Sequence, residues 1–252
     1  MKNINDLKYT QNHSFRISIK TIIILFIVFF IYNTSFSQIS TRVASTPYVG
    51  FGYTFDVFTN SDASDTYPAV SKNFELFKEI NLVGGIKLNR SLAIELSPSF
   101  AFSTYSANKG FNFTETDGIQ RFYLPQTVSF TAIPINARVK FFPFTVNPLG
   151  LLTNVYILGG GGPTYMKEVF DNYVFANESQ TSYLGAMTTT NSFWKPNYII
   201  GVGYGSAAKV GYNFELTYRM IPLDGLKDKP QTTSIAKDFN SVSLSAIIIF
   251  SF

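Results

Sequence analysis

The last fourteen residues of the chain, FNSVSLSAIIIFSF, alternate between apolar and small polar side chains. Counting back from the terminal Phe252 in steps of two gives an apolar row: Phe250, Ile248, Ala246, Leu244 and Val242. The positions between them include four serines. A period of two residues is that of a β-strand, whose successive side chains point to opposite faces. The stretch is therefore predicted to be a strand with one apolar face and one small, polar face.

Seven stretches upstream show the same alternation and are also predicted to be strands. They cover residues 48–57, 80–88, 92–105, 127–142, 152–165, 194–205 and 210–220, and the last strand covers 239–252. One row of each stretch is apolar or aromatic, and the other is rich in Ser, Gly, Asn and Thr with a few charges. The stretch 152–165 departs from this pattern because it is apolar on both faces, so its orientation stays open. The sequence predicts eight strands.

The connections between these strands alternate in length. Long links follow the first, third, fifth and seventh strands (residues 58–79, 106–126, 166–193 and 221–238), and short links follow the second, fourth and sixth. Aromatic residues gather near the ends that border the long links: Tyr67, Tyr105, Tyr123, Tyr165, Tyr183, Phe193 and Trp194. Short periplasmic turns, long external loops and an aromatic girdle are typical of outer-membrane β-barrels. We therefore predict an all-β fold, an eight-stranded antiparallel transmembrane up-and-down β-barrel.

A soluble lipocalin-like barrel is the main alternative, because it also has eight alternating strands. Its apolar rows would face inward and its outer surface would carry many charges, whereas only 14% of this chain is charged. The small polar rows fit the interior of an eight-stranded membrane barrel, which is just wide enough for side chains. The sequence therefore favours the membrane barrel.

The N-terminal segment, residues 1–37, is predicted to be a signal peptide, with the barrel domain at residues 38–252. A polar stretch with four basic residues precedes the apolar run 22–32, and small residues precede Gln38. A retained membrane anchor is the alternative, but a spanning helix needs about 20 apolar residues. The expected location is the outer membrane of a Gram-negative bacterium. The chain contains no cysteine, so we expect neither disulfides nor a lipid-attachment site.

The residue content excludes most catalytic chemistry, and we predict no enzyme activity, cofactor or metal site. The single histidine, His13, lies in the predicted signal peptide, which removes Ser-His triads and His-ligated metals. Residues 1–38 hold four of the 20 basic and one of the 16 acidic residues. The basic and acidic residues of the rest of the chain nearly cancel, so the net charge does not indicate a nucleic-acid partner. The acidic pairs Asp62/Asp65 and Asp224/Asp228 are interpreted as solvated loop charge, with bound calcium as the alternative.

Glycines at 159–162 and at 201, 203 and 205 are expected to make room for large neighbours or to relax strand curvature. No helix and no Gly-Lys-Ser/Thr sequence follows them, so they do not indicate a nucleotide site.

Seven charged residues fall on rows predicted to face the barrel interior: Asp56, Lys87, Glu95, Arg138, Lys140, Glu215 and Arg219. The lumen of such a barrel is too narrow for a water column, so we predict a paired plug, with an ion path as the alternative. Glu215 and Arg219 lie about 13 Å apart along one strand and cannot pair with each other. We expect Arg138 or Lys140 as partner of Glu215, and Glu95 or Asp56 as partner of Arg219.

Four features together resemble the PorT-like family of small outer-membrane β-barrels. They are the signal ending in Ser-Gln, residues 132–142 (AIPINARVKFF), residues 155–162 (VYILGGGG) and the last strand ending in Phe. The resemblance covers essentially the whole barrel domain and implies the barrel fold. For the namesake branch it implies a part in type IX protein secretion. In the resembled families the barrel insertion machinery reads the terminal aromatic row, so Phe250 and Phe252 are expected to form an assembly signal.

Two classes of function stay open. The first is a non-enzymatic integral outer-membrane protein with a structural or interaction role through its external loops. The link 166–193 is the main candidate, because its Tyr, Phe and Thr content favours strands that extend above the membrane and contact a partner. The second is a small pore or transporter for small or hydrophobic solutes. Expected partners are outer-membrane lipid, the insertion machinery and other envelope or secretion proteins.

Overall fold

The computed structural model describes residues 45–61, 63, 78–105, 110–115, 117–144, 150, 152–205, 209–224 and 237–252. The predicted signal peptide, residues 1–37, lies outside the described residues, and so do Asp62, Asp65, Tyr67 and Asp228. Within the described ranges no helix is long and apolar enough to cross a lipid bilayer.

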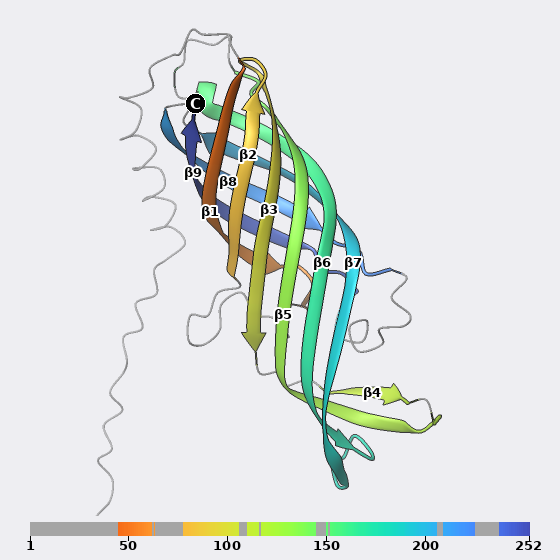
Figure 1. The fold of residues 1–252 in the computed structure, drawn as a ribbon. Coiled ribbons are helices and arrows are strands. Elements are labelled where there is room, and N and C mark those ends of the chain that lie inside the picture. The colour runs from red at the N-terminus through yellow and green to blue at the C-terminus, as the bar shows by residue number, and fades with distance from the viewer. Residues whose placement is uncertain are drawn as a thin grey trace, which may run out of the picture. The chain divides into compact units, whose positions relative to one another are not determined.

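Nine antiparallel strands form one sheet that closes on itself (Figure 1). They are β1 (Thr46–Phe58), β2 (Lys78–Lys87), β3 (Leu92–Tyr105), β4 (Phe111–Thr114), β5 (Gln120–Phe141), β6 (Val155–Phe175), β7 (Tyr183–Gly205), β8 (Val210–Met220) and β9 (Ser241–Ser251), with a 3-10 turn η2 (Leu152–Asn154) before β6. The order is β3-β2-β1-β9-β8-β7-β6-β5-β4, and β3 also pairs with β5. That pairing leaves β4 outside a ring of the other eight strands. The predicted eight-stranded up-and-down barrel is confirmed.

Apolar side chains cover the outside of the barrel, and polar side chains fill much of its inside. Outward residues such as Phe51 (52% exposed), Leu82 (58%) and Ile200 (56%) are widely exposed. The residues that alternate with outward rows, such as Thr54 and Asn136, are buried. A soluble lipocalin-like barrel has the reverse arrangement, so that alternative is excluded.

One half of the interior is apolar, and the sequence does not predict it. We call this cluster of buried residues the apolar cap; it consists of Phe58, Ala63, Ala101, Val128, Phe130, Ala132, Met166, Phe170, Phe193, Ile221, Leu223 and Phe239. The ring of Phe239 lies 5.5 Å from that of Phe58 and 5.2 Å from that of Phe130, centroid to centroid. Several of these residues fall in the predicted long links, where the sequence assigns no inward face.

Three strands are much longer than predicted. β5 begins at Gln120, β6 runs to Phe175 and β7 begins at Tyr183, so much of the expected loops 106–126 and 166–193 is strand. The ladder between β3 and β5 ends at Val128, and the ladder between β7 and β8 ends at Tyr198. Beyond these ladders β5, β6 and β7 continue, and their far ends project away from the ring (Figure 1). The sequence predicts strand extension within 166–193, but not its length.

We call the protruding part the extension sheet: β4 with residues 120–127, 171–175 and 183–188. Two turns shape its tip, and their left-handed residues are Gly118 (φ 78°) and Gln180 (φ 55°). The side-chain amide of Asn112 donates to the Glu178 carboxylate, which ties β4 to the turn between β6 and β7. These contacts hold the two hairpins together as one ordered unit.

Candidate functional site

Four of the predicted lumen charges form a closed network in the polar half of the barrel. Arg138 bonds to Glu95 (Nη2–Oε2 2.6 Å) and to Glu215 (Nη1–Oε2 2.8 Å). Lys140 bonds to the same two carboxylates, at 2.6 Å to Glu95 Oε1 and 2.8 Å to Glu215 Oε1. All four side chains are buried. Two acids and two bases therefore neutralise each other across the lumen, between β3, β5 and β8.

Two tyrosines complete this network, and the sequence prediction misses both. The Tyr48 hydroxyl donates to Glu95 Oε1 at 2.7 Å, and the Tyr156 hydroxyl donates to Glu215 Oε1 at 2.8 Å. The Lys140 ammonium lies 4.5 Å from the centroid of the Tyr156 ring. Gly203 makes room for that ring, because a Cβ at this position would collide with it. The expectation that this glycine accommodates a large neighbour is thus confirmed.

Arg219 has a partner that the sequence prediction does not name. Its guanidinium makes two bonds to Glu79, at 2.7 Å to Oε2 and 2.8 Å to Oε1. Expecting Glu95 as its ion-pair partner is wrong, because Glu95 pairs with Arg138 and Lys140. Glu79 takes that place because β2 begins at Lys78 and so turns Glu79 into the lumen. Asp56 lines the same small cavity as Arg219 and accepts a hydrogen bond from the Ser243 hydroxyl.

Lys87 lies apart from these charges. It is the last residue of β2 and only partly buried, and its ammonium lies 4.7 Å from the centroid of the Phe142 ring. It therefore stacks on an aromatic ring at the barrel end and is not part of the network.

Very little open space remains between the charges and the apolar cap. The cavity between them is lined by Asp56 and Arg219 on one side and by Phe130 and Phe239 on the other. Its volume is about 10 Å³, which is room for about one water molecule. Among the residues that the structure describes, Asp56, Arg219 and the apolar cap thus leave little open space at this level of the lumen.

Phe250 and Phe252 extend the outward apolar row of β9. The Phe250 ring stacks on Phe51 of β1 with centroids 6.2 Å apart. Phe252 is 77% exposed, and its backbone N–H donates to the Pro47 carbonyl at 3.1 Å. Their expected role as an assembly signal stays a prediction.

The described residues contain no group of His, Cys, Asp and Glu that could hold a metal ion. Asp224, from one of the two acidic pairs, is exposed, and its backbone carbonyl accepts a hydrogen bond from Lys195.

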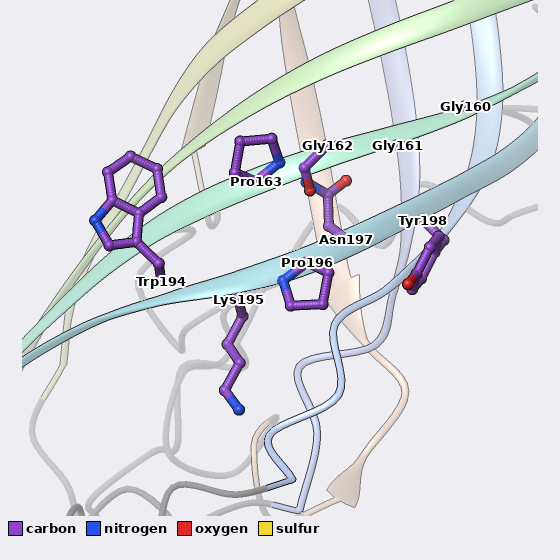
Figure 2. Close-up of a pocket in the computed structure, with 9 residues that line it drawn as sticks. All are labelled: Gly160, Gly161, Gly162, Pro163, Trp194, Lys195, Pro196, Asn197 and Tyr198. Carbon is purple, nitrogen blue, oxygen red and sulfur yellow. The ribbon is translucent and has the colours of Figure 1, made fainter.

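A groove of about 500 Å³ lies on the outer wall of the barrel, across β6 and β7 (Figure 2). It is lined by Gly160, Gly161, Gly162, Pro163, Trp194, Lys195, Pro196, Asn197 and Tyr198. Pro163 lies opposite Pro196, and Gly161 lies opposite Tyr198. The wall is hollow here because glycines and flat proline rings stand between two exposed aromatic side chains, Trp194 and Tyr198. Sequence reasoning misses it because the register that sets the prolines side by side is not evident from the sequence.

No protein-family model matches the chain, and no curated protein matches it. Similar solved structures include Ail, the attachment invasion locus protein of Yersinia pestis, in complex with the heparin analogue sucrose octasulfate. It is 11% identical, with a TM-score of 0.45, over 82% of this chain and 99% of Ail. Neisserial surface protein A is 13% identical, with a TM-score of 0.41, over 83% of this chain and 99% of its own.

A major outer membrane protein from Thermus thermophilus is 12% identical, with a TM-score of 0.42, over 83% of this chain and 100% of its own. At such low identities and TM-scores these likenesses carry no argument about function. The strand pairing described above establishes the eight-stranded, up-and-down, antiparallel β-barrel.

Proposed function

We propose that this chain is a non-enzymatic, integral outer-membrane barrel that binds a protein partner through its extension sheet. Its outer surface supports the membrane placement. On β6 the outward residues from Ile157 to Tyr165 are apolar, glycine, proline or aromatic, and the next outward residue is Lys167. A tilted strand of about 9–11 residues crosses the hydrocarbon core of a bilayer, which fits this apolar stretch.

The filled lumen argues against the pore alternative. A continuous water path would have to pass the apolar cap and the four-residue charge network, and the small cavity between the cap and the Asp56–Arg219 side of the lumen has room for about one water. Opening the path would unpair buried charges, at a cost of about 3–5 kcal/mol for each broken pair. The filled lumen therefore supports a function at the surface of the molecule.

The extension sheet is the observation that carries the interaction role. It exposes large side chains that the barrel does not need for contact with lipid: Tyr173 (43%), Tyr183 (58%), Leu184 (53%) and Met187 (50%). The Tyr183 ring packs against Tyr173 at 5.8 Å and Phe175 at 5.7 Å, so the tip is ordered before any partner arrives. Aromatic residues and methionine are enriched in protein–protein interfaces, and pre-ordering lowers the entropic cost of binding.

Photo-crosslinking in intact cells tests this role. A photoreactive amino acid at Met187 should give a discrete crosslinked protein species, whereas the same amino acid at the lipid-facing Leu244 should not. A variant in which an Asn-Gly turn joins Glu168 to Asn191, which pair directly across β6 and β7, should keep the barrel and lose that species. If the positions at the tip give no protein adduct in correctly inserted barrel, the proposal is wrong.

Planar-bilayer recording tests the pore alternative. The purified barrel should carry no steady ion current, and the hairpin-truncated variant should behave alike because the charge network and all of the apolar cap except Phe170 remain. A steady current in the wild-type barrel would favour a pore or transporter for small or hydrophobic solutes.

The resemblance to PorT-like barrels adds a narrower proposal, namely that the partner belongs to the type IX secretion machinery. The quoted motifs alone support it, since no family model matches. Deleting the gene should then block export of type IX cargo in the host, and unchanged export would contradict the assignment.

A further inference from the structure

The outer groove lies just inside the edge of the apolar band. Three outward rows on β5, β6 and β7 can be followed through the register; the row through Pro163 and Pro196 lies between the first and the second. The row Ala137–Gly161–Tyr198 is apolar or small, and the row Ile133–Tyr165–Trp194 is apolar and aromatic. The row beyond it, Thr131–Lys167–Ser192, is entirely polar. The groove thus lies on the apolar side of the boundary between the apolar and the polar rows, and the aromatic row lies at that boundary.

The aromatic row is a fixed structure. The rings of Tyr165 and Trp194 pack with centroids 5.3 Å apart, and Trp194 is 59% exposed. Tryptophan and tyrosine at a boundary between apolar and polar outward residues typically mark the level of the lipid headgroups. The groove therefore lies at the depth of acyl chains.

Lys167 is the charged group nearest to the groove on the same outward row of β6. It is exposed and lies two residues from Tyr165, about 7 Å along the strand. Its neighbours across the ladders, Thr131 and Ser192, are uncharged, and no ion pair of Lys167 is found among the residues that the structure describes. An ammonium group at this level can bind a phosphate.

We propose that this wall binds one phospholipid of anionic headgroup, with an acyl chain in the groove and the phosphate at Lys167. Two observations select this occupant. The groove is continuous with the lipid-facing band, so hydrocarbon is the medium that fills it, and the positive charge lies one row beyond the aromatic pair, where a headgroup phosphate would lie. The inference rests on the membrane placement proposed above.

Fluorescence quenching tests the site directly, because Trp194 is the only tryptophan of the chain and lines the groove. The barrel is reconstituted into phosphatidylcholine vesicles in which a minor fraction of the lipid has brominated acyl chains. Brominated phosphatidylglycerol should quench Trp194 with an apparent preference of about fivefold over brominated phosphatidylcholine, the effect of one lysine at a membrane surface. Equal quenching by the two lipids would overturn the proposal.

Three variants separate the parts of the site. Lys167→Gln should abolish the preference, and Pro163→Leu, which fills the groove, should also reduce it although the lysine remains. Lys78→Gln is the matched control, because Lys78 is also exposed and outward but lies on β2, across the ring from β7. Its preference should equal that of the wild type. A preference that survives Lys167→Gln or Pro163→Leu, or that is lost in Lys78→Gln, would overturn the site.

Failure of the membrane placement gives a different result. A barrel that does not enter the bilayer would show no quenching even in fully brominated vesicles, and its unboiled and boiled forms would not differ in gel migration. Quenching without headgroup preference leaves the membrane placement intact and removes only the lipid site.

Discussion

Replacing Glu215 by Gln should strongly destabilise the barrel. The buried carboxylate of Glu215 is bonded to Arg138, Lys140 and Tyr156, each at 2.8 Å. A neutral amide keeps the shape of the side chain but leaves two buried cations with the single carboxylate of Glu95. Removing one partner of a buried ion pair costs about 3–5 kcal/mol. We expect a loss of about 3 kcal/mol, since the amide oxygen can still accept one hydrogen bond.

Urea unfolding in phosphatidylcholine vesicles, followed by the fluorescence of Trp194, measures this loss. Asp224→Asn is the control, because Asp224 is exposed and its contact with Lys195 uses the backbone carbonyl. The control should change the free energy of unfolding by no more than about 0.5 kcal/mol. Adding Lys140→Met to Glu215→Gln removes the excess cation and should recover part of the loss.

Equal free energies of unfolding for Glu215→Gln and Asp224→Asn would refute this reasoning. That result would mean that water solvates the charges in the lumen, and the closed-barrel interpretation would have to be abandoned.

Three further predictions concern other parts of the molecule. Phe239→Ala should cost about 3–5 kcal/mol in the same unfolding assay, because Phe239 is fully buried in the apolar cap, whereas the exposed Phe144→Ala should cost far less. Phe252→Asp should lower the amount of barrel in the outer membrane while Phe252→Leu does not, and normal levels of the Asp variant would disprove an assembly signal. The pKa of Asp117 is lowered, mainly by the hydrogen bond from the backbone N–H of Ile119 and secondly by the one from Arg121. At pH values above the ordinary Asp pKa of about 4, the charged carboxylate therefore stabilises the turn before β5. This stabilisation should disappear as the pH falls through the lowered pKa, seen as faster amide exchange of Ile119 relative to its intrinsic rate, and Asp117→Asn should lack this pH dependence.

Most of the barrel can be predicted from sequence because its two surfaces impose a period of two on every strand. The terminal strand shows this well, since serines alternate with an unbroken apolar row from Val242 to Phe252. The alternation of apolar and polar residues is lost where the outer side and the inner side of a strand both face apolar surroundings. Residues 166, 170 and 193 face the apolar cap, so their strands lose the contrast between faces, and the segment containing them reads as a loop.

The charge network is predictable in its members but only partly in its pairing. Arg138 and Lys140 are the bases available to Glu215 on the predicted inward rows, and the structure places both there. Glu79 is missed because a strand boundary that is wrong by two residues removes a side chain from the lumen. The groove cannot be predicted, since it depends on which residues of β6 and β7 lie side by side.

The pairing of β1 with β9 has a consequence for how the barrel forms. This seam joins opposite ends of the domain, from Tyr48 with Ser251 to Phe58 with Ser241, whereas β6 and β7 are neighbours along the chain. Contacts that close long loops cost more entropy and form later than local ones. The β6–β7 hairpin can zip from its turn on its own, while the seam must wait until every other strand is in place. We therefore expect assembly to begin in the part of the chain that protrudes furthest and to end with the β1–β9 seam.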